Sequence, residues 1–188
     1  MPKAALEVYA FNVRFGDAIL VRVPDKDRNG TKTTLRHILI DVGNAPSVAR
    51  DPDSLPQPGQ GGGDDTVLTP AVDAILGVLN GAPLDLYVMT HEHMDHVQGL
   101  PYAEKNGPAG RSLRAILKPK HVWMTASAEG AAYYARHPQA KKELDGARAA
   151  YAVIAEHLAS AAAEERVGLG AILANNNPAS TGSCVDWL

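Results

Sequence analysis

Three histidines and two acids fall within six consecutive residues, in the segment HEHMDH at positions 91–96. Imidazole nitrogen and carboxylate oxygen are the donors that a borderline cation such as zinc prefers. Side chains alternate along an extended backbone, so His91, His93 and Asp95 are expected to point to one side. A turn at Asp95 and His96 would let His96 reach a second ion beside the first. The segment therefore predicts a metal centre.

Two other interpretations of this segment compete with a metal centre of that kind. His91 and Glu92 begin the H-E-x-x-H pattern of helical zinc proteases, but position 95 is Asp, and the apolar β-type run before the segment argues against a helix. The other interpretation is a polar loop with surface histidines. Three histidines interleaved with acids within six residues disfavour it.

The remaining titratable groups offer few further ligands or nucleophiles. His121 is either an additional ligand or a strand-edge residue. His137 is expected at a helix start, His157 on a helix flank, and His37 within a strand as a structural residue. Cys184 is the single cysteine, which excludes an intrachain disulfide and a thiolate metal cluster, and no histidine is near it in sequence. We therefore find no nucleophile triad.

The elements that must position segment 91–96 begin with strands. Runs rich in Val, Ile and aromatic residues, bounded by turn residues, predict strands. They cover residues 6–13, 18–24, 35–43, 84–90, 115–119 and 121–125. Asn29-Gly30 predicts a hairpin turn between the second and third strands. The third strand is almost continuously apolar, which predicts burial on both of its faces.

Two helical regions and one long loop complete the pattern. Thr69 and Pro70 are expected to begin a helix that ends at Asn80-Gly81. Residues 51–65 form a Pro/Gly-rich stretch that predicts a flexible loop. The alanine-rich region 127–167 predicts helix divided at Pro138 and ended by Gly168. The expected buried stripes are Val72, Ile75, Leu76 and Leu79 in the first helix, and Leu144, Tyr151, Ile154 and Leu158 in the alanine-rich region.

Composition is that of a globular protein. The 188 residues are 45% hydrophobic and 21% charged, with a net charge of −3, which fits one domain and excludes a disordered or fibrous chain. Residues 97–150 carry nine Lys or Arg against four Asp or Glu. Five of these cations lie between Lys105 and Lys120, either as a solvated surface or as a patch facing a phosphate. No run reaches the roughly 20 apolar residues of a membrane span, so a cytoplasmic protein without membrane contact is expected.

The segment THEHMDH resembles the H-x-H-x-D-H signature of the metallo-β-lactamase superfamily. The segments FGDAILVRVP and HILIDVGNA are similar to the opening strands of that family, where a strand ends in Asp-x-Gly near the metals. The sequence Gly16-Asp17-Ala18-Ile19-Leu20 is most similar to the branch of hydrolases related to competence DNA uptake. The resemblance covers residues 6 to 125 well.

The resemblance implies an α/β fold (α+β), the N-terminal half of an αββα sandwich with a mixed β-sheet flanked by helices. It implies His91 and His93 as ligands of one zinc ion, and Asp95 and His96 as ligands of a second, with manganese or iron as other metals. Asp95 would also hold the attacking hydroxide. Asp41 would orient a ligand through hydrogen bonds, and the alternative interpretation is a strand-ending Asp in a turn. The family's later ligands have no good match, and the chain ends at Trp187-Leu188 within an expected helix, so we expect residues 1–188 to be one incomplete domain.

The function implied is metal-dependent hydrolysis of a phosphodiester or another ester, with a nucleic-acid substrate weakly indicated by the basic run. The alternative is a metal-binding or interaction module without turnover. An iron-containing redox member is a third possibility, but no flavin-type domain is visible in the sequence. Substrate and oligomeric state are not determined by the sequence.

Overall fold

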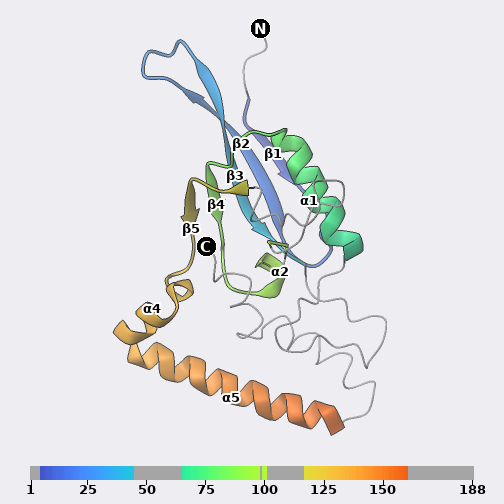
Figure 1. The fold of residues 1–188 in the computed structure, drawn as a ribbon, viewed down its shortest axis with the longest axis vertical. Coiled ribbons are helices and arrows are strands. Elements are labelled where there is room, and N and C mark those ends of the chain that lie inside the picture. Colours follow the sequence, from blue (N-terminus) through green and yellow to red (C-terminus); the bar gives the residue numbers. More distant parts are fainter. Residues whose placement is uncertain (1–4, 45–64, 98, 101–116, 161–188) are drawn as a thin grey trace.

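The computed structural model describes residues 5–44, 65–97, 99–100 and 117–160 (Figure 1). The elements in chain order are β1 (Glu7–Ala10), β2 (Ala18–Lys26), β3 (Thr33–Val42), α1 (Asp65–Leu79), β4 (Leu86–Val88), α2 (Met94–Val97), β5 (His121–Trp123), the 3-10 helix η2 (Ala126–Glu129), α4 (Ala131–Arg136) and α5 (Pro138–Ser160).

The five strands form one mixed sheet in the order β1-β2-β3-β4-β5. The pairs β1–β2 and β2–β3 are antiparallel, whereas β3–β4 and β4–β5 are parallel. The structure therefore confirms the expected mixed α and β fold with a mixed sheet. Because β3 and β4 run in the same direction, their carboxyl ends lie at the same edge of the sheet.

The hairpin between β2 and β3 turns where the sequence predicts. Gly30 has a φ of 67°, which glycine adopts without steric cost. The backbone N–H of Asp27 donates to the carbonyl of Lys32 at 2.9 Å and closes the turn. Both strands are longer than predicted, because pairing continues outward to Lys26 and Thr33.

The hydrophobic core lies between α1 and one face of the sheet. Leu20, Leu39 and Tyr87 are buried on neighbouring strands of that face, and the predicted stripe of α1 packs in the same cluster. Of that stripe, Val72, Ile75 and Leu79 are buried and Leu76 is partly buried. The predicted start of the helix was wrong: α1 begins at Asp65, so Pro70 lies inside it. Val67 and Leu68 are buried, and this burial extends the helix upstream of Thr69.

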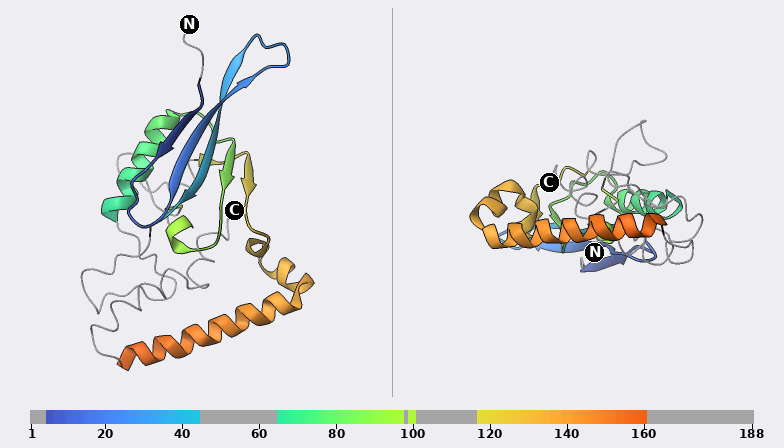
Figure 2. Two further views of the ribbon diagram at one scale, coloured as in Figure 1. Left: turned by 180° about the vertical axis from the view of Figure 1, so that it is seen from behind. Right: turned by 90° about the horizontal axis from the view of Figure 1, so that it is seen from below.

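The opposite face of the sheet carries no helix among the described residues. Side chains alternate along each strand, so the neighbours of the core residues face away from α1. The strand register places these residues in two adjacent rows that end at His121 and Trp123, and their apolar members are Val8, Ala10, Ile19, Val21, Ile38, Ile40, Leu86, Val88 and Trp123. Val8 remains 61% exposed and Trp123 69% exposed at the two edges. No helix among the described residues covers this face (Figure 2), and the predicted burial of β3 on both faces was wrong for that reason.

The region after residue 116 differs from prediction in two respects. Residues 117–119, the described part of the predicted strand 115–119, are not in a strand, and Lys118 has a φ of 36°. Pro138 divides the helical region as predicted, since α4 ends at Arg136 and α5 begins at Pro138.

The predicted buried stripe of α5 was wrong at Ile154, which is 39% exposed. Leu144 and Tyr151 are only partly buried, because α5 lies away from the sheet in Figure 1 and contacts α4 near its own start. The side chain of Leu158 and residues 51–64, 161–167 and 168–188 are outside the described part, so the predictions for them stay predictions. None of the described helices is both long and apolar enough to cross a membrane.

Candidate metal centre

The histidine segment begins three residues after Val88, where β4 ends, and lies beside the end of β3. Thr90 links the two strand ends, because its backbone N–H donates to Asp41 Oδ1 at 2.8 Å and its hydroxyl donates to Asp41 Oδ2 at 2.6 Å. The site therefore forms where the carboxyl ends of two parallel strands meet, the usual position of ligand sites in sheets of this kind.

The segment does not stay extended as far as Asp95. Residues Met94–Val97 form the short helix α2, and the backbone N–H of His96 donates to the carbonyl of His93 at 3.0 Å. The prediction that His91, His93 and Asp95 share one side of an extended strand was therefore wrong. The predicted turn is present, however. Consecutive helical residues are about 100° apart around the axis, so the adjacent Asp95 and His96 can serve one site.

Gly43 and Gly16 allow close backbone contact with the histidine segment at residues 91–96. A Cβ on Gly43 would lie 2.4 Å from the carbonyl carbon of Asp95 and 2.5 Å from the nitrogen of His96. A Cβ on Gly16, whose φ is 147°, would lie 2.3 Å from the carbonyl oxygen of Gly43. A Cβ on Gly99 would lie 2.3 Å from Val42 Cγ1. Any larger residue would move the backbone that carries Asp95 and His96.

Asp41 is the hydrogen-bond centre of the site. Its side chain is 1% exposed, and Oδ2 lies 2.8 Å from His96 Nδ1. Its φ of 50° is in the left-handed region, which Asp tolerates better than most residues. This placement agrees with the orienting role that the family resemblance implies, because a carboxylate on one ring nitrogen fixes which nitrogen faces a ligand.

The three imidazoles of the segment gather on one side of Asp41. The ring centroid of His91 lies 3.8 Å from that of His96 and 4.5 Å from that of His93. The donor atoms of His91, Asp95 and His96 all lie within 4.8 Å of one another. His93 is exposed and lies outside that group, so the structure brings together three of the four predicted ligands and leaves His93 beside them.

The histidine pKa values reflect this crowding. Burial lowers the pKa of His91, and the neighbouring His96 and His93 lower it further. Burial also opposes the protonation of His96, but the hydrogen bond to Asp41 and the charge of Asp95 outweigh it and raise the pKa of His96. The pKa of His91 is thus shifted toward the neutral form that a metal ligand needs, whereas Asp41 and Asp95 favour the protonated form of His96.

Two residues of the site were not identified from the sequence. Asp17, the residue before β2, has Oδ2 at 3.6 Å from His96 Nδ1, and with Asp41 and His96 it forms a second group whose donor atoms lie within 4.8 Å. Thr90 Oγ1 lies 3.1 Å from His91 Nδ1. Since Thr90 donates its proton to Asp41, its oxygen accepts from His91 Nδ1–H. The position of Asp17 in the segment FGDAIL was the only available sequence signal.

The four other histidines lie apart from this cluster. His37 is buried in β3 and His121 is exposed in the edge strand β5. His137 lies at the junction of α4 and α5, where its ring contacts Tyr133, and His157 is exposed on α5. None joins a donor group among the described residues, in agreement with the structural interpretation of each.

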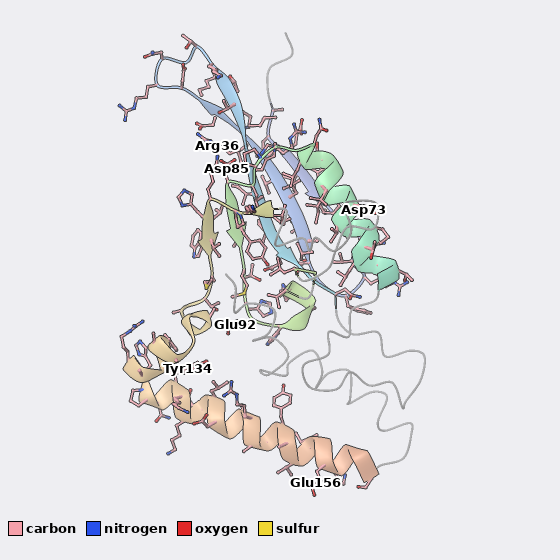
Figure 3. The ribbon with its side chains drawn as sticks, in the orientation of Figure 1. Arg36, Asp73, Asp85, Glu92, Tyr134 and Glu156 are labelled. Atoms are coloured by element: carbon pink, nitrogen blue, oxygen red, sulfur yellow. The ribbon has the colours of Figure 1, made fainter. Side chains whose placement is uncertain are left out.

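The described end of the basic run lies at the other end of the sheet. Lys120 immediately precedes β5 and Asp85 immediately precedes β4. Lys120 Nζ is 2.7 Å from Asp85 Oδ1, and Arg36 Nη1 is 3.2 Å from the same oxygen. Figure 3 shows Arg36 and Asp85 at one end of the sheet and Glu92, within the histidine segment, toward the other. Lys120 therefore does not face the histidine cluster. Lys105, Arg111 and Arg114 are outside the described residues.

Comparisons with protein-family models, with curated proteins and with solved structures found no match for this chain. The assignment of a function consequently rests on the residues and geometry above.

Proposed function

We propose that this protein is a metal-dependent hydrolase of metallo-β-lactamase type, with its metal site at the carboxyl ends of β3 and β4. The observation that carries the proposal is the convergence of the donor atoms of His91, Asp95 and His96 within 4.8 Å. The resemblance of the segment 91–96 to the family signature supports the same conclusion independently of the geometry.

The donor set fits zinc. Tetrahedral zinc with ligands at about 2.1 Å would separate donor atoms by roughly 3.4 Å. Donors already within 4.8 Å reach that spacing through side-chain movements of about an ångström. Two imidazoles and one carboxylate are also the number of protein ligands that catalytic zinc sites use, with a fourth position left for water. The family resemblance pairs the exposed His93 with His91 on one ion, and the two ring centroids lie 4.5 Å apart.

A bound zinc ion would supply a hydroxide at neutral pH, because it lowers the pKa of its water to about 7. The protein's contribution is to hold the ligands rigidly and to orient the water. Asp41 and Thr90 fix the ring positions of His96 and His91 through their Nδ1 atoms. Asp95 Oδ2, 3.6 Å from His96 Nε2, is placed to accept a hydrogen bond from a water bound beside that nitrogen.

The open face of the sheet supports the fold part of the proposal. An apolar sheet face with Val8 and Trp123 exposed at its edges is the surface that a second sheet covers in a sandwich. Under the proposal this face packs against a second layer, and α1 remains as the outer helical layer on the core side.

The substrate class is proposed as a phosphodiester or another ester. Its support is the similarity of the segment at 16–20 to the competence-related branch, since Lys120 points away from the site. A local phosphate patch near the histidines would have to come from other cations.

The test is to purify the protein with zinc or manganese, measure bound metal, and offer bis-p-nitrophenyl phosphate, a thioester and a cephalosporin. We expect bound metal, turnover of the phosphodiester, and loss of both in His91→Ala. His157→Ala is the matched control, because this exposed histidine on α5 belongs to no donor group in the described part of the chain. Turnover of the thioester alone would refute the phosphodiester preference.

The same assay separates the enzyme from a binding module. Bound metal without turnover of any ester would favour the alternative of a non-catalytic metal-binding protein. Absence of bound metal in the wild-type protein, together with absence of turnover, would refute the proposed function itself.

A further inference from the structure

We propose that Asp17 is a positioning residue of the metal site. Together with Asp41, it holds the His96 ring at Nδ1. This inference rests on the proposed function. It assigns a role to a carboxylate just before β2, 74 positions before the first residue of the histidine segment at 91–96.

The backbone of Asp17 already connects the parts of the site. Its N–H donates to the carbonyl of Asp95 at 3.2 Å, and its carbonyl accepts from the N–H of Gly43 at 3.1 Å. The backbone of residue 17 is therefore hydrogen-bonded both to the histidine segment at 91–96 and to the residues that follow Asp41. Figure 1 shows the resulting arrangement, with α2 lying against the ends of β2 and β3.

These backbone bonds direct the side chain to His96. Asp17 Oδ2 lies 3.6 Å from His96 Nδ1, and Asp41 Oδ2 lies 2.8 Å from the same nitrogen. The two carboxylates differ in environment, because the side chain of Asp41 is 1% exposed and that of Asp17 is 54% exposed. Asp41 makes the buried hydrogen bond, and Asp17 adds negative charge from the solvent side.

The placement of Asp17 argues for an indirect role rather than metal ligation. Both carboxylates lie at Nδ1 of His96, whereas Asp95 lies 3.6 Å from Nε2 on the other side of the ring. A zinc ion shared by His91, Asp95 and His96 would therefore be separated from Asp17 by the imidazole. A proton on Nδ1, accepted by Asp41 and attracted by Asp17, directs Nε2 toward the metal position.

The experiment measures zinc and cobalt(II) binding to the full chain in three variants. Asp17→Ala removes the carboxylate, Asp17→Asn keeps its size without the charge, and Asp73→Ala removes an acid on α1 (Figure 3) as the matched control. We expect about a tenfold loss of zinc affinity in Asp17→Ala, within the range found for groups that orient metal ligands. A smaller loss is expected in Asp17→Asn, and none in Asp73→Ala.

Two further readouts separate positioning from folding and from ligation. Urea unfolding of the metal-free protein should be the same in wild type and Asp17→Ala, because the backbone bonds of residue 17 remain. The visible absorption of bound cobalt(II) should keep its intensity, with a shifted maximum, because the donor set is unchanged.

Each other result overturns the inference. Equal zinc affinity in wild type and Asp17→Ala refutes it while leaving the proposed function intact. Loss of one whole equivalent of zinc in Asp17→Ala makes Asp17 a ligand instead. A wild-type chain that binds no zinc refutes the proposed function, and the inference with it.

Discussion

Replacement of Asp41 by Asn tests whether one buried carboxylate organises the metal site. Asn has the same shape and also tolerates the left-handed φ of 50° found at this position, so the backbone should not change. The amide oxygen can still accept the N–H of Thr90, as Oδ1 does now at 2.8 Å. The amide nitrogen then replaces Oδ2, which accepts from His96 Nδ1 at 2.8 Å.

The loss of unfolding free energy in Asp41→Asn depends on which hydrogen-bond donors lose their acceptor. Thr90 is exposed, so its hydroxyl can turn to water, whereas His96 is buried and cannot. A hydrogen bond to a charged group contributes about 1.5–3 kcal/mol, so we expect a loss of about 2 kcal/mol of unfolding free energy. For a domain of this size, that corresponds to a decrease in Tm of roughly 4–8 °C. Zinc affinity should fall by about 10- to 100-fold, because His96 loses its orientation.

Urea unfolding of the metal-free protein and calorimetric zinc titration measure the two effects separately. Asp73→Asn on α1 is the control, and it should change neither quantity. The reasoning is wrong if Asp41→Asn loses less than about 0.5 kcal/mol and keeps its zinc affinity, since surface substitutions without special contacts have effects of that size.

Three further changes test other parts of the structure. Burial raises the pKa of Asp85, but hydrogen bonds from Lys120, the His37 N–H and Arg36 outweigh it and lower that pKa from 3.8 to about 2. The ionised Asp85 side chain with these hydrogen bonds stabilises the protein by about 2 kcal/mol above pH 3.8. This contribution is lost as the pH falls toward 2. The difference in urea midpoint between wild type and Asp85→Asn should therefore shrink between pH 4 and pH 2, and a constant difference would contradict this. Burial, followed by the charge of Arg22, lowers the pKa of His37 below 6.5, so the unfolded chain binds its proton more readily. Stability of the metal-free protein should fall as the pH drops below about 6.5, and it should fall less steeply in His37→Leu; equal slopes would count against a buried neutral imidazole. Gly43→Ala should lower zinc affinity and cost about 1–3 kcal/mol, because its Cβ would meet the backbone of Asp95 at 2.4 Å. The matched Gly77→Ala in α1, where a Cβ meets no atom within 4 Å, should instead stabilise the protein by about 0.5–1 kcal/mol, and similar effects at both positions would refute the argument.

The strands and the first helix could be predicted because their signals are local. Alternation, β-branched residues and Asn29-Gly30 located the β2–β3 hairpin, and the apolar spacing located α1. Predictions failed where distant packing overrides local preference. The start of α1 moved to Asp65 because Val67 and Leu68 are buried, and the apolar stripe of α5 stayed exposed at Ile154 because no described element packs over it.

The sequence by itself determined the donor types of the candidate site, since His91, His93, Asp95 and His96 are contiguous and their chemistry does not depend on the fold. The tertiary structure decided which carboxylates hold them. It placed Asp41 at Nδ1 of His96 and brought Asp17, which precedes β2, to the same ring. The physical reason is that these contacts cross sequence separations of more than 50 residues and depend on the close backbone approach at Gly16 and Gly43, and no local pattern encodes such contacts.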